Sequence, residues 1–569
     1  MGAVWRCVPA DGRPRRRVGG RRQTGWMYIV LERRPDGGVL AHHADDDGRV
    51  TATDAVPEGG LAAYVSGREP GDIRWVWHDT AAWYPRLLSA GVRVERCHDL
   101  RLAHAILRSS LLTAHTSIAA APSSGWDRLA GAAAVDLDAL FDVEQRDDLD
   151  PVAEFALQRE AVTGSDGRIG RLVNAESAGA LVAAEMTHAG LPWRADAHDA
   201  LLEAALGPRP RHGERPAELE RLADEVRRAL DAPELNPDSP PELVRALRRA
   251  GLTVDSTRSH ELKRIEHPVI PPLLEFKKLA RLHTANGWHW LDTWVHDGRF
   301  RPVYVPGGVV TGRWASNGGG ALQLPAQVRS AVIADPGWKL VVADAAQLEP
   351  RVLAGMSADT AMATAARAND LYQAMVDSGA VQTREQAKYG ILGAIYGGTR
   401  GESGRMLPRI TRAYPRALAL VEDAARAGER GERVRTWLGR TSPLPGEAIV
   451  TTADEPDAVD RAAQGRARAW GRFTRNFVVQ GTAAEWALHW MATLRIRLWE
   501  LGEGRLEERP HLAFFLHDEV VVHTPEGSAE RVAEAIRECA AEAGRLLFGS
   551  FPIEFPLSVA IVDDYGQAK

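Results

Sequence analysis

The chain is long, slightly acidic and of ordinary globular composition. Its 569 residues allow several domains; 45% are hydrophobic and 26% charged, and the net charge is −6. A negative net charge excludes a uniformly basic surface, so any contact with nucleic acid has to be local. The three cysteines, Cys7, Cys97 and Cys539, are far apart and odd in number, which argues against disulfides and a cysteine zinc site and fits a reducing cytoplasm. The sequence contains no run of about 18 apolar residues, so we expect no membrane span, and no signal peptide is visible.

The first 26 residues have a composition of their own. They carry seven arginines and one acid, with five glycines and two prolines. We predict a disordered basic arm over residues 1–26 or, alternatively, a chain whose true start is Met27. A basic arm suits contact with nucleic acid, although a solvated tail is the default interpretation.

From Met27 to about residue 165, short apolar runs alternate with helical patterns, which predicts an α/β domain. Two stretches rich in small or acidic residues are predicted to be loops or linkers. The predicted strands are 27–34 and 75–79, and the predicted helices are 83–92 and 101–112. The predicted linkers are 118–135 and 142–150.

Helical patterns dominate the next part of the chain, at 176–190, 217–230 and 241–250. Between residues 241 and 283, nine Lys/Arg outnumber five Asp/Glu. Lys277, Lys278 and Arg281 stand beside apolar positions there. Contact with phosphate and a solvated helix face explain these cations about equally well.

The last part of the chain changes pattern twice. Residues 301–343 predict β-structure with glycine turns, and the chain is then mostly helical to about residue 500. Strands return at 511–524 and 555–564, with a helix at 528–547 between them.

The stretch 383–398 carries a cationic and aromatic pattern. Arg384, Lys388, Leu392 and Tyr396 recur every four residues, so a helix keeps all four on one face. Two cations followed by an apolar and an aromatic residue suit a polyphosphate at one end and a flat ring at the other. For one helix alone, an ordinary charged surface helix is the simpler interpretation. Gly390 favours a close approach by another group, because glycine is costly inside a helix.

Acidic residues interrupt two apolar strands. Asp344 ends the run WKLVVAD, and Asp518 and Glu519 lie inside LAFFLHDEVVVH. Burying a carboxylate without a partner costs several kcal/mol, so these acids indicate a bound partner. The residues around His517 predict a tight hairpin, and two aspartates from separate strands suit a pair of Mg²⁺ or Mn²⁺ ions. A turn-capping role for Asp518 is the simple alternative.

Taken together, these motifs resemble the family A DNA polymerases. The resemblance extends from about residue 166 to the C-terminus, and five motifs occur in the family's order. The similar stretches are Thr311-Gly312-Arg313 with Leu322-Gln323 and Arg329, Asp344 to Arg351 with Glu349, Arg384 to Gly397, Arg472 to Ala484 with Asn476 and Gln480, and His517-Asp518-Glu519.

The resemblance implies an α/β and α+β multidomain chain. An RNase H-like, exonuclease-type domain would occupy residues 27–165, and a right-hand polymerase domain would occupy residues 166–569. Within the latter, the thumb would span about 196–300, the palm about 301–357 and 471–569, and the fingers about 358–470.

The resemblance also implies a site for metals and nucleotide. Asp344, the backbone carbonyl of Ala345 and Asp518 would bind two Mg²⁺ ions, with Mn²⁺ as a substitute, and Glu519 would support the site near the primer end. Arg384 and Lys388 would hold the triphosphate, and Lys388 would also protonate the leaving pyrophosphate. The nucleotide-binding residues would be Arg384, Lys388, Leu392, Tyr396, Gln347 and Glu349. Glu349, bonded to Tyr396, would crowd a ribose 2′ hydroxyl and favour deoxynucleotides.

Contacts with the primer–template would run through phosphates and the minor groove, indifferent to sequence as a template copier requires. The residues at matching positions are Arg313, Gln323, Arg329, Arg472, Asn476, Gln480, His517, Lys277, Arg281 and Thr284.

The sequence also departs from the family's pattern. Ala345 and Ala346 replace a Tyr-Ser pair, Pro350 replaces an aliphatic residue, and Leu392 replaces an aromatic that stacks on the nucleotide, a contact worth about 1–3 kcal/mol. The front domain lacks the proofreading carboxylates: Leu31-Glu32-Arg33 stands near the expected Asp-x-Glu, Trp83 aligns with an expected aspartate, and only Asp99 matches a secondary position. We therefore expect a degenerate 3′–5′ exonuclease-like domain without activity, and no 5′ nuclease domain.

These observations predict a monomeric DNA-templated DNA polymerase. It would act on primer–template DNA and deoxynucleoside triphosphates, in the bacterial cytoplasm at the nucleoid, in repair or gap filling. Three alternatives stay open: a DNA-binding scaffold descended from a polymerase, a related RNA polymerase, and a polymerase with active proofreading. The retained acids and cations argue against the first, Glu349 against the second, and the missing front-domain carboxylates against the third.

Overall fold

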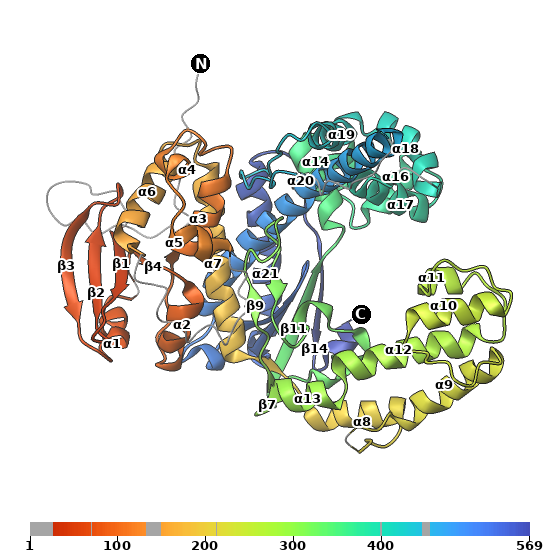
Figure 1. The fold of residues 1–569 in the computed structure, drawn as a ribbon. Helices are drawn as coiled ribbons and strands as arrows, with labels where there is room; N and C mark the ends of the chain where they lie inside the picture. Colours follow the sequence, from red (N-terminus) through yellow and green to blue (C-terminus); the bar gives the residue numbers. More distant parts are fainter. Residues whose placement is uncertain are drawn as a thin grey trace.

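The computed structural model describes residues 27–69, 71–131, 149–211, 213–398, 401–445 and 456–568. Figure 1 shows a front domain on the left, a sheet at the centre, and an upper and a lower helical lobe on the right. The predicted arm 1–26, Cys7 and most of the predicted linker 142–150 lie outside the described residues. No helix among the described residues is long and apolar enough to cross a membrane.

The front domain is built on a five-stranded mixed sheet of order β3-β2-β1-β4-β5. The pairs β3–β2 and β2–β1 are antiparallel, whereas β1–β4 and β4–β5 are parallel. Apolar side chains from the strands and α2 form its core, as the alternation of buried positions requires. Its elements are β1 (Met27–Arg33), β2 (Val39–Ala44), β3 (Val50–Val56), α1 (Leu61–Ser66), β4 (Ile73–Trp77), α2 (Thr80–Ser89), β5 (Cys97–Asp99), α3 (Leu100–Ser109), α4 (Ser117–Ala120), α5 (Gly125–Gly131) and α6 (Pro151–Thr163).

The central sheet has four antiparallel strands in the order β12-β13-β11-β14. The largest apolar cluster of the molecule joins this sheet to α7, α20 and α21. The strands are β11 (Trp338–Ala345), β12 (His511–Leu516), β13 (Glu519–Pro525) and β14 (Leu557–Val562), and the helices are α7 (Arg168–Ala189), α20 (Pro456–Glu500) and α21 (Ala529–Phe548).

The lower helical lobe projects from the central sheet between α7 and β7 in the sequence (Figure 1). Leucines and valines on the inner faces of its amphipathic helices form a separate small core. Its helices are α8 (Ala195–Leu206), α9 (Ala217–Ala229), α10 (Pro240–Arg249), α11 (Ser259–Leu262), α12 (Ile270–Asn286) and α13 (Trp288–Trp294).

The upper helical lobe follows β11 and has its own apolar core, which includes Phe477 and Val479 of α20. The first half of the long helix α20 packs against α19, and its second half packs against α7 and α21. This one helix therefore connects the upper lobe with the central sheet. The other helices of the lobe are α14 (Leu348–Ser357), α15 (Thr360–Ala365), α16 (Leu371–Asp377), α17 (Arg384–Tyr396), α18 (Gly401–Ala413) and α19 (Pro415–Glu429).

Two segments differ from their predictions. One has less regular secondary structure than its pattern predicts, and the other has more. Residues 301–337, predicted as β-structure, are mostly irregular. Several glycines there, such as Gly312 and Gly318, have positive φ, a backbone conformation that interrupts an extended ladder. The stretch 118–131, predicted as a linker, contains the short helices α4 and α5. The short elements are β6 (Leu191–Pro192), β7 (Val295–His296), β8 (Arg299–Phe300), β9 (Tyr304–Val305), β10 (Ala315–Ser316) and the 3₁₀ turns Ala321–Gln323, Ala326–Ala331, Leu506–Glu508, Glu526–Ser528 and Tyr565–Ala568.

Candidate functional site

The predicted hairpin around Asp518 is present at one end of the central sheet. His517 and Asp518 form the turn between β12 and β13, and His517 adopts the left-handed conformation with φ +61°. On the neighbouring strand, Asp344 stands opposite Glu519. The backbone N–H of Ala345 donates to the carbonyl of Asp518 at 3.0 Å, which fixes the end of β11 against the turn. The two aspartates therefore come from separate strands to the same edge, as the sequence predicts.

The electrostatics of this edge favour a cation. Burial and then the negative charge of Asp344 raise the pKa of Asp518 to about 6, from an ordinary value of 3.8. The negative charge of Asp344 thus destabilises the charged form of Asp518, and a divalent cation between the two would relieve that repulsion.

Glu519 is held differently. Its carboxylate is buried and accepts a hydrogen bond from the Tyr565 hydroxyl, and Arg329 lies 3.3 Å from it. The Arg329 guanidinium also lies over the Tyr565 ring, 4.6 Å from its centroid. The sequence predicted a DNA contact for Arg329, but its side chain is engaged in this buried cluster.

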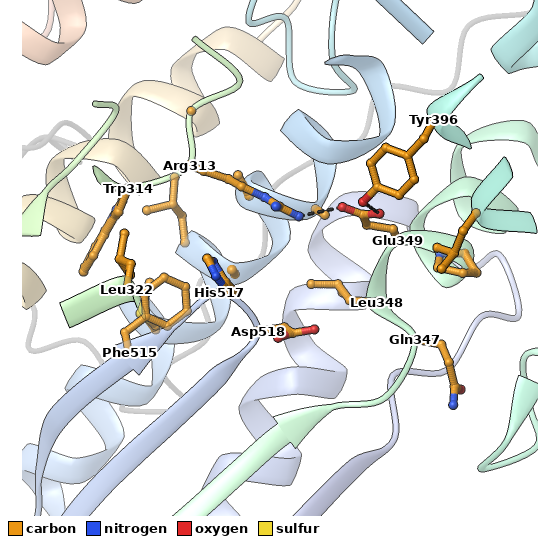
Figure 2. Close-up of a pocket in the computed structure, with 18 of the residues that line it drawn as sticks. Arg313, Trp314, Leu322, Gln347, Leu348, Glu349, Tyr396, Phe515, His517 and Asp518 are labelled. Carbon is orange, nitrogen blue, oxygen red and sulfur yellow. Dashed lines mark hydrogen bonds and ion pairs between the residues drawn. The ribbon is translucent and has the colours of Figure 1, made fainter. Parts of the chain in front are cut away.

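A pocket of about 310 Å³ opens beside Asp518. Figure 2 shows Asp518 and His517 at its floor, Arg313, Glu349 and Tyr396 on one side, and Trp314, Leu322 and Phe515 at its far end. The pocket is therefore polar where it meets the carboxylate and apolar where it meets α20. Its lining residues are Gly312, Arg313, Trp314, Leu322, Gln347, Leu348, Glu349, Pro350, Tyr372, Leu392, Tyr396, Ala483, Ala484, Ala487, Leu488, Met491, Phe515, His517 and Asp518.

Glu349 is held from both sides of this pocket. The Tyr396 hydroxyl donates to its Oε2 at 2.5 Å, and the Arg313 guanidinium donates to its Oε1 at 2.6 Å (Figure 2). The first bond is the one that the resemblance implies; the second was not predicted. Burial and the carboxylate raise the pKa of Tyr396 far above its ordinary value, so the hydroxyl remains a donor. This bridge joins the loop before β10 to α14 and α17.

The two predicted cations of α17 lie outside the pocket lining. Arg384 is exposed and pairs with Asp370 at 2.6 Å. Lys388 is exposed and makes no ion pair with a residue that the structure describes. Leu392 and Tyr396, further along the same helix, reach the pocket. The close approach predicted from Gly390 is made by α18, whose Ile410 side chain occupies the space that a Cβ at Gly390 would need.

The predicted DNA contacts fall into three groups. Arg313 and His517 line the pocket. Gln480 and Asn476 lie half-buried along α20, Arg472 is exposed near Gly397, and Gln323 is exposed on a 3₁₀ turn. In the lower lobe Arg281 and Thr284 are exposed on α12, whereas Lys277 donates to the carbonyl and the hydroxyl of Thr257.

Gln347, which the resemblance suggested, lines the pocket and accepts from Arg351 and from the backbone N–H of Leu371. Two other lining residues carried no signal in the sequence. Tyr372 of α16 and Trp314 also line the pocket, but neither belongs to a periodic pattern. Only a tertiary structure reveals them.

The front domain shows no cluster of acids at the positions where the resemblance would place them. Glu32 bonds to His42 at 2.9 Å, and Trp83 is buried with its indole N–H donating to His78 at 2.8 Å. The Asp99 carboxylate accepts from Leu102 and Thr80 and caps α3. Nowhere in the described parts of the chain do three or more His, Cys, Asp or Glu side chains form a group able to hold a metal ion.

The residues at the sheet edge nevertheless fit Mg²⁺. Two adjacent carboxylates, Asp344 and Asp518, supply hard oxygen ligands whose mutual repulsion a cation would relieve. Mg²⁺ is commonly bound by one or two carboxylates together with water and substrate phosphates, so a third side-chain ligand is not needed.

The fold and the site together define a multidomain protein with paired carboxylates at a sheet edge and a pocket between that edge and a helical lobe. The family model "DNA polymerase family A" matches residues 212–565, more than half of the chain. The chain therefore belongs to DNA polymerase family A.

Similar proteins agree with this assignment. The thermostable DNA polymerase I of Thermus filiformis is 27% identical over 390 residues, covering 60% of this chain and 43% of that protein. The thermostable DNA polymerase I of Thermus aquaticus is 28% identical over 395 residues, with 62% and 44% covered. The chain thus spans less than half the length of these relatives. The POL domain of Pol1 from M. smegmatis, solved in complex with DNA primer–template and dNTP, superposes with a TM-score of 0.60 at 18% identity and covers 96% of both chains, which shows a shared fold.

Proposed function

We propose that the protein is a DNA-templated DNA polymerase that adds deoxynucleotides to a primer 3′ end. The observation that carries this proposal is the meeting of Asp344 and Asp518 beside a pocket that contains the Glu349–Tyr396 pair, in a chain of family A. The structural neighbour binds primer–template DNA and dNTP, and we assign the same two partners to this chain.

The proposal extends to the layout of the molecule. The lower helical lobe would be the thumb, the central sheet the palm, and the upper helical lobe the fingers. The front domain, with its β3-β2-β1-β4-β5 sheet, would be an exonuclease-like domain. Because its predicted acid positions hold Leu31 and Trp83, and Glu32 is bonded to His42, we propose that it does not proofread.

Asp344, Asp518 and the carbonyl of Ala345 would hold the two metal ions. When bound, these ions would lower the pKa of the attacking primer hydroxyl and neutralise charge on the leaving pyrophosphate. Glu519, fixed by Tyr565 and Arg329, would keep the turn that carries Asp518 rigid.

The nucleotide would lie along α17. Its ring end would meet Leu392 and Tyr396, and its phosphates would meet Lys388 and Arg384, with Arg384 exchanging Asp370 for phosphate. A ribose 2′ hydroxyl would meet Glu349, whose two oxygens already accept from Tyr396 and Arg313. Crowding and desolvation of that hydroxyl against a carboxylate already held by Tyr396 and Arg313 would disfavour a ribonucleotide.

The primer–template would run past Arg313, His517, Asn476 and Gln480. The buried Oδ1 of Asn476 has no hydrogen-bond partner among the described residues, so a donor on the DNA minor groove would satisfy it. Contacts of this kind read little sequence, which suits a copier of any template. Repair or gap filling is the role we propose.

A primer-extension assay tests the function. We expect a labelled primer on a template to lengthen with Mg²⁺ and deoxynucleotides, and the Asp344→Ala protein to bind the DNA without extending it. Extension that persists in Asp344→Ala would contradict the assigned site. DNA binding by the wild type without any extension, in Mg²⁺ and in Mn²⁺, would show that the protein is a DNA-binding scaffold and not a polymerase. Primer shortening without nucleotides would show that the front domain proofreads.

A further inference from the structure

Helix α18 carries three arginines on one face. Arg405, Arg409 and Arg412 follow one another at spacings of four and three residues, which places them within an arc of about 60° on a helix. All three side chains are exposed. A different side of α18 packs against α17, where the buried Ile410 meets Gly390. We call these three residues the arginine face.

The arginine face lacks the acidic partners that some exposed arginines of the upper lobe have. Arg384 pairs with Asp370 at 2.6 Å and Arg426 with Asp423 at 2.6 Å. By contrast, Arg405, Arg409 and Arg412 make no ion pair with any residue in the part of the chain that the structure describes. Like charges three and four residues apart destabilise a helix. Their concentration on one face of an acidic protein therefore points to an anionic partner.

Exposed aromatic rings lie on the adjacent helix. Tyr389 of α17 is 49% exposed and Tyr396 is 43% exposed. They are seven residues apart, so they lie on the same face of α17 about two turns from each other. Tyr396 lines the pocket, and α17 and α18 pack side by side in the upper lobe (Figure 1). Cations and exposed rings thus continue from the pocket along the lobe.

We propose that the arginine face and Tyr389 bind the unpaired template strand ahead of the pocket. Basic side chains that follow a backbone, together with rings on which bases stack, are the combination that single-stranded nucleic acid requires. A duplex would offer phosphates but no free base to Tyr389. The inference rests on the proposed function, because only a template-directed enzyme has an unpaired strand at this place.

The test compares two primer–templates by fluorescence anisotropy in EDTA over a range of salt concentrations. They share one duplex and differ in a 5′ template overhang of about two or about twelve nucleotides. We expect the wild type to bind the long overhang more tightly. In the triple variant R405Q/R409Q/R412Q this advantage should vanish, and the slope of log affinity against log salt should fall by about 2, since each single-strand phosphate contact contributes about 0.7.

Two further variants sharpen the test. The triple variant R531Q/R537Q/R545Q removes the same charge from exposed positions of α21 and should keep both the advantage and the slope. Tyr389→Leu should weaken binding of the long overhang without changing the slope, because stacking carries no charge.

An R405Q/R409Q/R412Q protein that keeps the wild-type slope would overturn the proposal, as would equal losses on both overhangs, which would mean that the face binds duplex. Failure of the proposed function is distinguishable, because extension of the short-overhang primer by the wild type does not depend on the arginine face.

Discussion

Replacing Asp518 by Asn is expected to stabilise the metal-free protein at neutral pH. Burial and Asp344 raise the pKa of Asp518 to about 6 from 3.8. The folded state therefore binds this proton more tightly than the unfolded chain. The free energy of unfolding consequently falls as pH rises from about 3.8 to 6. Above pH 6 this contribution no longer changes with pH. A difference of roughly two pKa units is worth about 3 kcal/mol. Because the side chain is partly exposed, solvent screening reduces the expected gain to about 1–2 kcal/mol.

The assay is urea unfolding in EDTA from pH 4 to 8, followed by tryptophan fluorescence. The midpoint of Asp518→Asn should exceed that of the wild type by an amount that grows up to pH 6 and is constant above pH 7. Asp423→Asn, which removes an exposed ion-paired carboxylate, should show no such growth. Added Mg²⁺ should stabilise the wild type by mass action and Asp518→Asn less. An Asp518→Asn protein less stable than the wild type at pH 8 in EDTA would refute the reasoning.

Three further changes test the pocket and the domain contact. Leu392→Phe should lower the KM for deoxynucleotides in primer extension about tenfold, because stacking on an aromatic ring contributes about 1–3 kcal/mol. Glu349→Ala should raise the incorporation of ribonucleotides relative to deoxynucleotides in single-turnover extension, because the carboxylate held by Tyr396 no longer crowds the 2′ position. Arg495→Met should lower the free energy of unfolding by about 3 kcal/mol, because it removes the shorter of the two ion pairs of the buried Glu185 and leaves only Arg93 to compensate its charge.

For each of these three predictions, one outcome would contradict it. An unchanged KM in Leu392→Phe would show that the base does not reach this position. A ribonucleotide ratio equal to the wild type in Glu349→Ala would move sugar selection elsewhere. For Arg495 the control is Arg426→Met, since the Arg426–Asp423 pair is exposed and worth at most about 1 kcal/mol. An equal decrease in the free energy of unfolding in the two variants would show that burial does not make the Arg495–Glu185 pair stronger.

The sequence predicts best where local pattern decides the structure. Asp344 follows a run of buried apolar residues, and the strands on either side of His517 leave room only for a tight turn, so both ends of the carboxylate pair were predictable. The face shared by Leu392 and Tyr396 follows in the same way from helical periodicity. The family resemblance then supplied the bond between Glu349 and Tyr396.

Pairings that depend on side-chain reach were not predictable. Arg313 meets Glu349 across 36 residues of chain, and Arg384 meets Asp370 across 14. Nothing in the local sequence distinguishes these partners from other acids. The segment after residue 301 was misjudged for another reason: its apolar residues, such as Trp314, are buried as single anchors between glycine turns rather than along a ladder. Strand periodicity therefore could not describe it.

The front domain, which carries Leu31 and Trp83 where the resemblance would place acids, is tightly bound to the rest of the molecule. The Arg495 guanidinium, at the far end of α20, is buried against Glu185 of α7 at 2.6 Å and donates to the backbone carbonyls of Val94 and Glu95 in the front domain. Arg93 and Tyr84 donate to the same Glu185 carboxylate.

A buried cluster of this kind stabilises one arrangement of its elements, because separating any partner would leave a charge without compensation. The helix it fixes is the one whose middle turns, at Ala484 and Met491, line the pocket. Its first half also packs in the core of the upper lobe through Phe477 and Val479. The front domain is thus anchored to the helix that joins the pocket to the upper lobe. The anchoring contacts are made by Tyr84, Arg93 and the backbone carbonyls of Val94 and Glu95, and none of these is a position where the resemblance would place a proofreading acid.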